Sequence, residues 1–334
     1  MNKQNILLIC GGDGSEHDIS VISSNYILEV LEASEKYAVT IVTLHNNAFT
    51  LDNGTEVFFV GRSIKSADLS YSMDVDCVIP CLHGIPGETG DIQSFLEILN
   101  IPYIGCKKEA SLNCFNKVTT KLYLDAYGIK NSPYLIVPHN NEIYHQKALE
   151  FFDDNGQDVY VKAASQGSSI GCYHVKNRDD LIDSIVEAFM FSESIVIEKT
   201  IEHRELEVAA YEYNGELKVT APGEVIIPDN VFYTFDEKYS KNSHTVTTLE
   251  PELDSRIVEK IRAIAKETFV KMNLRHLSRI DFFLTKDNEI IVNEINTFPG
   301  MTSISLFPKL LIHNGDDILT FLEYIIHNAM TSDR

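Results

Sequence analysis

Hydrophobic and polar residues alternate with two different periods along the chain, and this pattern predicts strands and helices in alternation. Short apolar runs bounded by turn residues predict buried strands at residues 5–10, 39–44, 56–60, 77–82, 134–137, 159–163 and 195–198. Longer stretches with an apolar residue at every third or fourth position predict amphipathic helices at residues 19–35, 91–99, 109–127 and 252–272. The alternation predicts an α/β fold that opens with a doubly wound parallel sheet.

A predicted hairpin near the C-terminal end organises the candidate chemistry. Two apolar runs, at residues 280–284 and 290–295, flank Asp287 and Asn288. Both residues tolerate the left-handed backbone that a two-residue turn requires, so we expect the runs to pair through such a turn. An Asn-Gly pair at residues 214–215 predicts a second hairpin in the same way.

The register set by this turn places four polar side chains on one face of the hairpin. Asp281 lies opposite Glu294 and Arg279 opposite Asn296, and side chains two apart on a strand share a face. Two neighbouring buried carboxylates are costly unless a cation joins them. Because the donors are hard oxygens, Asp281, Glu294 and Asn296 predict a site for magnesium or manganese. The alternative is a solvated face with an ordinary ion pair to Arg279.

Composition and charge exclude several classes of function. The chain has 334 residues, of which 44% are hydrophobic, which predicts a globular protein of two or three domains. A net charge of -21 argues against binding to nucleic acid or to an anionic membrane. No apolar segment approaches the roughly 18 residues of a membrane span, and the N-terminal apolar run is too short for a signal peptide. We therefore expect a cytoplasmic protein whose six cysteines are buried and reduced.

Polar residues follow two predicted strands of the first domain. Glycines at positions 11, 12 and 14 end the first strand, and Glu16 and His17 come next. This is not the GxGxxG fingerprint, which disfavours a nicotinamide cofactor. His83 and Glu88 follow a later strand, in a position from which they could contact a substrate. As isolated residues, all four are more often structural groups.

A lysine followed by a loop rich in glycine and serine predicts contacts with phosphate. Lys162 leads directly into the sequence SQGSSIG at residues 165–171, whose backbone N–H groups could fold over phosphate oxygens. The Walker A pattern does not occur, and a plain hairpin turn is the alternative. Lys117 and Lys121 lie four residues apart on a predicted helix, which usually indicates a solvated stripe.

A long polar stretch at residues 228–248 has neither a strand nor a helix period. Loops of this length in compact domains are usually functional or disordered, and the aromatic residues here argue against disorder. We therefore expect a lid. A lid that excludes water favours phosphoryl chemistry with a reactive intermediate.

Taken in order, these motifs resemble those of the D-alanine:D-alanine ligases of the ATP-grasp superfamily. The resemblance covers nearly the whole chain and is carried by SEH at 15–17, LHGxxGExGxIQ at 82–93, IPYIG at 101–105, VKxxxxGSSIG at 161–171, EKxIxxRE at 198–205, FYxFxxKY at 232–239, RIDFF at 279–283 and NEINTFPGMT at 293–302. It implies a doubly wound domain at residues 1–105, then two ATP-grasp subdomains at 106–200 and 201–334 that sandwich the nucleotide. The lid at 228–248 belongs to the second of these subdomains.

The resemblance also implies roles for individual residues. For ATP it implies Lys117, Lys162, Ser169, Glu198, Glu205 and Lys238. For two magnesium or manganese ions it implies Asp281, Glu294 and Asn296. For the two D-alanine molecules and the reacting atoms it implies Glu16, Ser168, Tyr239, Arg279, Gly300 and Ser305. Glu16, linked to Ser168 and Tyr239, would take the ammonium group of the first D-alanine, and Arg279 with the Gly300 N–H would stabilise the tetrahedral intermediate.

The implied activity is an ATP-dependent D-alanine:D-alanine ligase, which makes the dipeptide for peptidoglycan through an acyl phosphate, and family resemblance suggests a homodimer. The alternatives are a related ligase that uses D-serine or an L-amino acid, and a nucleotide-binding regulator without activity. Five departures from the family pattern put the nearby loop geometry in doubt, namely Asn116 and Thr89 for aspartate, Ala163 for proline, and Ser94 and His276 for glycine.

Overall fold

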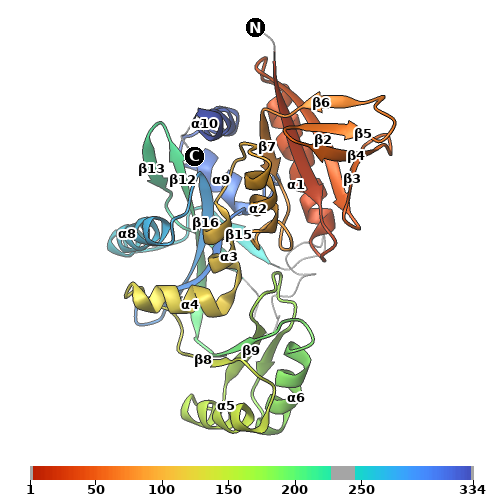
Figure 1. Cartoon of the computed structure of the whole chain (residues 1–334). Helices are drawn as coiled ribbons and strands as arrows, with labels where there is room; N and C mark the ends of the chain where they lie inside the picture. The colour runs from red at the N-terminus through yellow and green to blue at the C-terminus, as the bar shows by residue number, and fades with distance from the viewer. Residues whose placement is uncertain (1–2, 227–244, 332–334) are drawn as a thin grey trace.

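The computed structural model describes residues 3–226 and 245–331, which fold into three sheets that follow one another along the chain (Figure 1). Lys238, Tyr239 and most of the predicted lid lie outside the described residues. The last residues of the predicted lid form strand β15 (Val246–Thr248). Within the described ranges, no helix has the length and apolar character that crossing a membrane requires.

The first sheet has seven strands in the order β6-β5-β4-β3-β2-β1-β7. Its parallel part confirms the expected sheet and consists of β1 (Gln4–Gly11), β2 (Tyr37–His45) and β7 (Cys77–Pro80). An antiparallel extension continues it through β3 (Ala48–Leu51), β4 (Glu56–Val60), β5 (Ser63–Ser66) and β6 (Ser72–Asp74). Of these four strands the sequence predicted only β4, because the other three are too short to show a period. Helices α1 (His17–Glu32) and α2 (Asp91–Ile98) pack beside the sheet.

The second sheet has four antiparallel strands in the order β10-β9-β11-β8. They are β8 (Tyr134–Val137), β9 (Val159–Ala163), β10 (Cys172–Val175) and β11 (Ile195–Lys199). Helices α5 (Glu142–Asp154) and α6 (Arg178–Ala188) cover one face of this sheet (Figure 1) and share its apolar core. The opposite face is left to line a cavity.

The third sheet has six strands, with β15-β14-β12-β16-β17 in order and β13 paired to β12. Its remaining strands are β12 (His203–Tyr213), β13 (Glu216–Val219), β14 (Gly223–Ile226), β16 (Leu277–Thr285) and β17 (Ile290–Asn296). The predicted Asn-Gly hairpin is confirmed, since Tyr213 pairs with Glu216. Helix α8 (Ser255–Lys271) packs on one face of the sheet, and α9 (Leu306–His313) and α10 (Ile318–Thr331) pack on the other.

The predicted helix at 109–127 is two helices, α3 (Lys108–Phe115) and α4 (Lys117–Ala126). The break falls at Asn116, which has an extended backbone and whose side chain accepts hydrogen bonds from the N–H groups of Val118 and Thr119. An N-cap of this kind starts a new helix, and the period of apolar residues does not reveal it. Both helices contribute to the core beneath the third sheet, although they precede the second sheet in the chain.

One hydrophobic core joins the first sheet to the end of the chain. Ile6, Leu8 and Ile27 of the first unit are fully buried with Phe307 and Phe321 of helices α9 and α10. The predicted domain boundaries at 105 and 200 fall between the sheets, and they stay predictions because the packing crosses them.

Candidate active site

The hairpin of β16 and β17 has the predicted pairing at the residues that matter. Asp281 pairs with Glu294 and Arg279 pairs with Asn296, so the predicted register is confirmed there. Asp281 is only 2% exposed, which contradicts the alternative of a solvated face. The four side chains line one cavity beside the sheet.

The predicted two-residue turn of this hairpin is wrong. Thr285 N donates a hydrogen bond to Glu289 O at 3.0 Å, so the turn has three residues, the last of which is Asn288 with a φ of 61°. A bulge between Asp281 and Phe282 offsets the extra turn residue. Two departures from the expected hairpin therefore cancel, and the polar residues stay opposite one another.

Arg279, Asp281 and Glu207 form a buried group of charges that we call the Arg279 cluster. Arg279 donates to both carboxylate oxygens of Asp281, at 2.8 and 2.7 Å, and its Nε lies 2.9 Å from Glu207 Oε2. Glu207 pairs with Asp281 across β12 and β16. Burial alone would lower the pKa of Arg279, but Asp281 and Glu207 outweigh it and raise that pKa well above its usual value. Arg279 is therefore a fixed cation between two carboxylates.

The acidic face of the hairpin fits a divalent metal ion. Asp281, Glu294 and Asn296 offer carboxylate and amide oxygens on one side of the sheet, which are the donors that magnesium prefers. Asn296 Nδ2 donates to Asp281 Oδ2 at 3.0 Å, so its amide oxygen remains as an acceptor. Three or more His, Cys, Asp or Glu side chains do not cluster with metal-binding geometry anywhere in the described part of the chain. The candidate site therefore has two carboxylates and one amide.

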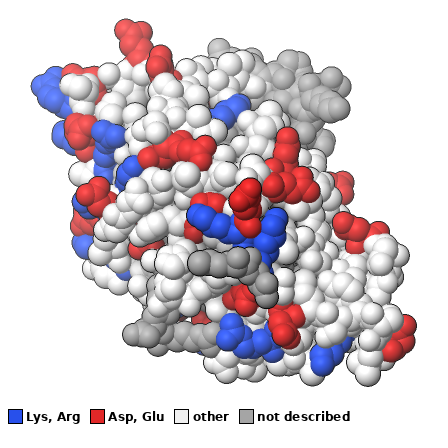
Figure 2. All heavy atoms as spheres, turned by 90° about the horizontal axis from the view of Figure 1, so that it is seen from above, with Lys and Arg blue, Asp and Glu red and all other residues white. Residues whose placement is uncertain are grey.

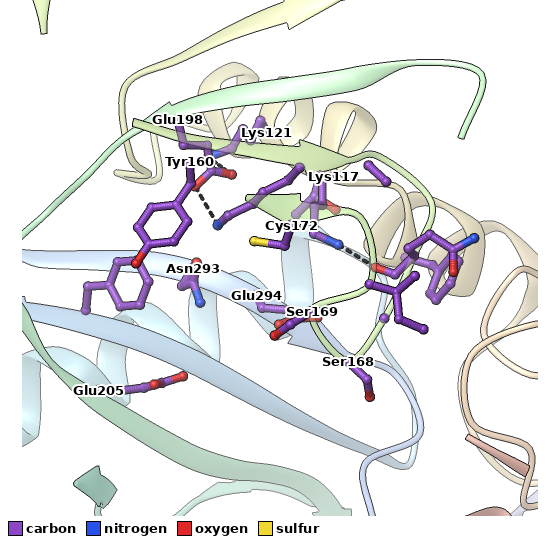
Figure 3. A pocket seen from close by; sticks show the side chains of 18 of the residues that line it. Lys117, Lys121, Tyr160, Ser168, Ser169, Cys172, Glu198, Glu205, Asn293 and Glu294 are labelled. Carbon is purple, nitrogen blue, oxygen red and sulfur yellow. Dashed lines mark hydrogen bonds and ion pairs between the residues drawn. The ribbon is translucent and has the colours of Figure 1, made fainter. Parts of the chain in front are cut away.

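A second charged group lies in the cavity between the second and third sheets (Figure 3), and we call it the Lys121 cluster. It consists of Lys121, Glu198 and Lys162, which come from α4, β11 and β9. Lys121 Nζ lies 3.2 Å from Glu198 Oε1, and Lys162 Nζ lies 3.0 Å from Glu198 Oε2. The interpretation of Lys121 as part of a solvated stripe is wrong, because α4 packs its Lys121 face against the second sheet, where 4% of the residue is exposed.

The pKa values of the Lys121 cluster follow from its charges. Burial alone would raise the pKa of Glu198, but Lys162 and Lys121 outweigh it and lower that pKa to about 2. Burial would lower the pKa of Lys162, and Glu198 reverses this and raises it above the usual range. Glu198 and Lys162 are therefore charged near neutral pH. Burial lowers the pKa of Lys121, and the charge of Glu198 acts against this effect.

The glycine- and serine-rich loop between β9 and β10 borders the same cavity. Lys117 Nζ donates to Gln166 O at 2.6 Å, and Lys117 N donates to Ala164 O at 2.8 Å. Asn116 Nδ2 donates a hydrogen bond to Ser165 Oγ at 2.8 Å. An ionised aspartate at this position could not donate and could only accept a hydrogen bond from the serine hydroxyl. Ser169 and Glu205 line the cavity together with these residues (Figure 3). The departure at Asn116 thus ties the helix start to the loop.

Glu16 lies where loops of two sheets meet. Ser168 Oγ donates to Glu16 Oε1 at 2.6 Å. A Cβ atom at Gly84 would lie 2.5 Å from Glu16 Oε2, and one at Gly167 would lie 2.9 Å from the same oxygen. Only glycine can approach the carboxylate this closely at both positions. The contact to Tyr239 that the resemblance implies lies outside the described residues.

The loop before α9 holds Gly300 and Ser305. Helix α9 starts at Leu306, and Ser305 precedes it as the N-cap residue. Ser305 Oγ accepts a hydrogen bond from Thr302 N at 3.1 Å, and a Cβ atom at Gly300 would lie 3.0 Å from that oxygen. Both residues line the cavity that contains Arg279.

His83 and Glu88 hold the chain just before Gly300. His83 Nδ1 lies 3.2 Å from Phe298 O and must donate, because a carbonyl oxygen only accepts. Glu88 Oε1 accepts from Phe298 N at 3.3 Å. Burial raises the pKa of Glu88 to about 7, and the charge of Glu16 adds to this effect. The sequence placed both residues in a loop near substrate, and in the structure they also position the Gly300 loop.

The sequence did not indicate a role in the site for Glu207 of the Arg279 cluster or for Lys121 of the Lys121 cluster. It also gave no role to Ser132, which links Lys121 to Glu198. Glu207 lies two positions after Glu205 on one strand, and this spacing could have indicated a shared face. The spacing on the helix indicates that Lys121 is a solvated residue, whereas the structure buries it. Ser132, whose Oγ contacts both Lys121 and Glu198, precedes β8 and gave no signal.

Comparison with known proteins gives matches over the full length of the chain. The family described as D-ala D-ala ligase N-terminus matches residues 5–106, and that described as D-ala D-ala ligase C-terminus matches residues 123–327. A D-alanine--D-alanine ligase of Vibrio campbellii is 52% identical over 328 residues, or 98% of this chain and 99% of that protein.

Solved structures give the same result for the fold. D-alanyl-alanine synthetase A from Vibrio cholerae has a TM-score of 0.94 at 47% identity, covering 99% of this chain and 100% of that one. A D-Ala:D-Ser ligase from Enterococcus faecalis has a TM-score of 0.85 at 23% identity, covering 98% of this chain and 100% of that one. At this lower identity the similarity concerns the fold alone.

Proposed function

The chain belongs to the D-alanine--D-alanine ligase family, and from this premise we propose that it joins two D-alanine molecules into a dipeptide with conversion of ATP to ADP and phosphate. One observation carries the proposal beyond the family match. Glu294 lines both the cavity of the Lys121 cluster and that of the Arg279 cluster. A phosphate donor in the first cavity and a carboxylate acceptor in the second would therefore meet beside Glu294.

ATP would bind in the cavity between the second and third sheets. Lys117 and Lys162 supply positive charge for the phosphates, and the loop that contains Ser169 supplies N–H groups. Glu205 borders the same cavity from β12 and would accept hydrogen bonds from the nucleotide. Lys238 remains a predicted contact to the transferred phosphoryl group and lies outside the described residues.

Asp281, Glu294 and Asn296 would hold the two magnesium or manganese ions. When bound, such ions offset the charge that develops on transferring phosphoryl oxygens. The protein residues around them have separate tasks. Arg279 remains in place through Asp281 and Glu207, so its guanidinium is oriented before the reaction begins.

The reaction would proceed in two steps. Glu16, fixed by Ser168, orients the first D-alanine through its ammonium group, and the carboxylate of that D-alanine attacks the γ-phosphorus of ATP to give an acyl phosphate and ADP. The amine of the second D-alanine then attacks the acyl carbon. Arg279 and the Gly300 N–H stabilise the resulting oxyanion, phosphate leaves, and Ser305 binds the carboxylate of the second D-alanine. We further propose that the enzyme acts in the cytoplasm as a homodimer.

Phosphate release with a panel of amino acid pairs tests this function. We expect ATP- and magnesium-dependent phosphate release with D-alanine alone, and much less with D-alanine plus D-serine or with L-amino acids. Activity only with another pair would replace the proposed substrate with that pair. Nucleotide binding without turnover of any pair would favour a regulatory protein instead.

A further inference from the structure

We propose that Lys121 sets the charge of the nucleotide site, because it neutralises Glu198 and so leaves the charge of Lys162 available for the phosphates of ATP. In this proposal Lys121 is a positioning residue that acts through Glu198. The inference rests on the proposed function only in taking ATP as the ligand of this cavity.

The contacts of Lys121 favour a charged ammonium group. Its Nζ lies 3.2 Å from Glu198 Oε1, 2.8 Å from Ser132 Oγ and 3.4 Å from Asn131 Oδ1. Its ammonium also lies 5.0 Å from the ring centroid of Tyr134. A neutral amine has a lone pair to place, and this shell of acceptors and an aromatic face suits three N–H donors instead. The side chain is 5% exposed, so solvent barely screens this charge.

The two oxygens of Glu198 are divided between the two lysines. Lys121 contacts Oε1, and Lys162 contacts Oε2 at 3.0 Å. Ser132 closes the arrangement, because its hydroxyl accepts from Lys121 and donates to Glu198 Oε2 at 3.0 Å. Glu198 therefore has a cation on each oxygen.

Counting charges shows what Lys121 contributes. Two ammonium groups and one carboxylate leave a net charge of one positive unit on a set of residues that line the cavity. Without Lys121, Lys162 and Glu198 would form a neutral pair. A neutral pair attracts a polyphosphate far less than a cation does, and the difference is large in a poorly hydrated pocket. The net positive charge of the Lys121 cluster thus depends on Lys121.

The first experiment compares ATP with adenosine, which lacks the phosphates. Calorimetry on the full-length Lys121→Met variant should show ATP binding weakened by about tenfold, as expected for one charge at short range. Adenosine binding should stay within about twofold of the wild type, since adenosine has no phosphate for this charge to attract. Lys147→Met is the matched control, because Lys147 also lies over a tyrosine, at 4.9 Å from the Tyr144 ring, but is exposed on α5.

The second experiment restores the charge without restoring the lysine. Glu198→Gln alone raises the net charge of the cluster to two, so the ratio of ATP affinity to adenosine affinity should rise. The double variant Lys121→Met/Glu198→Gln returns the net charge to one, and this ratio should return to about the wild-type value. Lys121→Arg keeps the positive charge, so this variant should have about the wild-type ratio of ATP affinity to adenosine affinity.

Several results would overturn the proposal. Equal weakening of ATP and adenosine in Lys121→Met would show a purely structural role, and unchanged ATP binding would show no role in the site. A ratio that does not rise in Glu198→Gln would also contradict it, and that variant gives the test even if Lys121→Met does not fold. If the wild type binds no ATP, the proposed function fails first, and the charge argument has no ligand to act on.

Discussion

The Arg279 cluster and the Lys121 cluster are built from the same kinds of groups in opposite proportions. The first has one cation between two carboxylates, and the second has one carboxylate between two cations. Neither set is neutral, although burying an uncompensated charge is costly. The excess is negative where we propose metal ions and positive where we propose phosphates. We infer that the surplus charge of a buried cluster reports the charge of the ligand it awaits.

Removal of the central cation should produce the largest effect. Arg279→Met leaves Asp281 and Glu207 as two buried carboxylates, and we expect a loss of about 3–5 kcal/mol in the free energy of unfolding. Phosphate release should fall by about 100- to 1000-fold, because an oxyanion would lose its stabilising group. Urea unfolding with and without magnesium measures the first effect. Magnesium should restore more stability to the variant than to the wild type.

Arg256→Met is the control for this change, because Arg256 pairs with Asp254 on the surface with 85% of its side chain exposed. Its free energy of unfolding should stay within about 0.5 kcal/mol of the wild type. If magnesium stabilises neither the wild type nor Arg279→Met, the acidic hairpin does not bind the ion.

A smaller but sharper effect is expected at the junction of the two cavities. Glu294→Ala removes a proposed metal ligand while leaving the Arg279 cluster intact, so the variant should fold and lose metal-dependent phosphate release by about 100-fold. Glu289→Ala on the same hairpin is the control, since Glu289 pairs with the exposed Lys130. Unchanged activity in Glu294→Ala would refute the metal assignment.

The Lys121 cluster should also affect how the free energy of unfolding changes at acidic pH. The pKa of Glu198 is lowered from 4.5 to about 2 in the folded protein, so its stabilisation is present above pH 4.5 and is lost as the pH falls toward 2. Between pH 7 and pH 3 this group should account for a loss of about 2 kcal/mol in the free energy of unfolding. Chemical unfolding of Glu198→Gln at both pH values should show a smaller loss than the wild type. An equal loss in the two proteins would mean that Glu198 is not paired as described.

The smallest expected effect concerns the hydroxyl that links the two sides of the Lys121 cluster. Ser132→Ala keeps all three charges and removes one acceptor of Lys121 and one donor to Glu198. We expect a loss of about 1 kcal/mol in stability and a change of less than about threefold in ATP affinity. A loss of ATP affinity as large as that of Lys121→Met would show that geometry, rather than charge, governs the site.

The two clusters also differ in how far the sequence predicts them. The Arg279 cluster depends on residues a few positions apart in one hairpin. The period of two along a strand aligns Arg279 with Asp281, and the pairing of the two strands brings Asn296 to the same face. The predicted turn was nevertheless one residue short. The predicted pairs Asp281–Glu294 and Arg279–Asn296 are still correct, because the bulge between Asp281 and Phe282 offsets the extra turn residue. No local sequence pattern predicted the bulge.

The Lys121 cluster could not be predicted from spacing. Its members come from α4, β9 and β11, and they meet only when the helix docks on the second sheet. On the isolated helix, Lys117 and Lys121 are an exposed pair by every local rule. The resemblance to a known family supplied roles for Lys117 and Lys162, and left Lys121 without one.

The shared core of the first sheet and the last two helices has a consequence for biosynthesis. Helix α1 and strand β1 leave the ribosome long before α9 and α10, whose Phe307 and Phe321 bury against the same cluster as Ile6 and Leu8. During translation the apolar side chains of β1 and α1 that pack against α9 and α10 therefore remain exposed until translation is nearly complete. A chain cut short before α10 would keep that surface exposed and present it to chaperones and proteases.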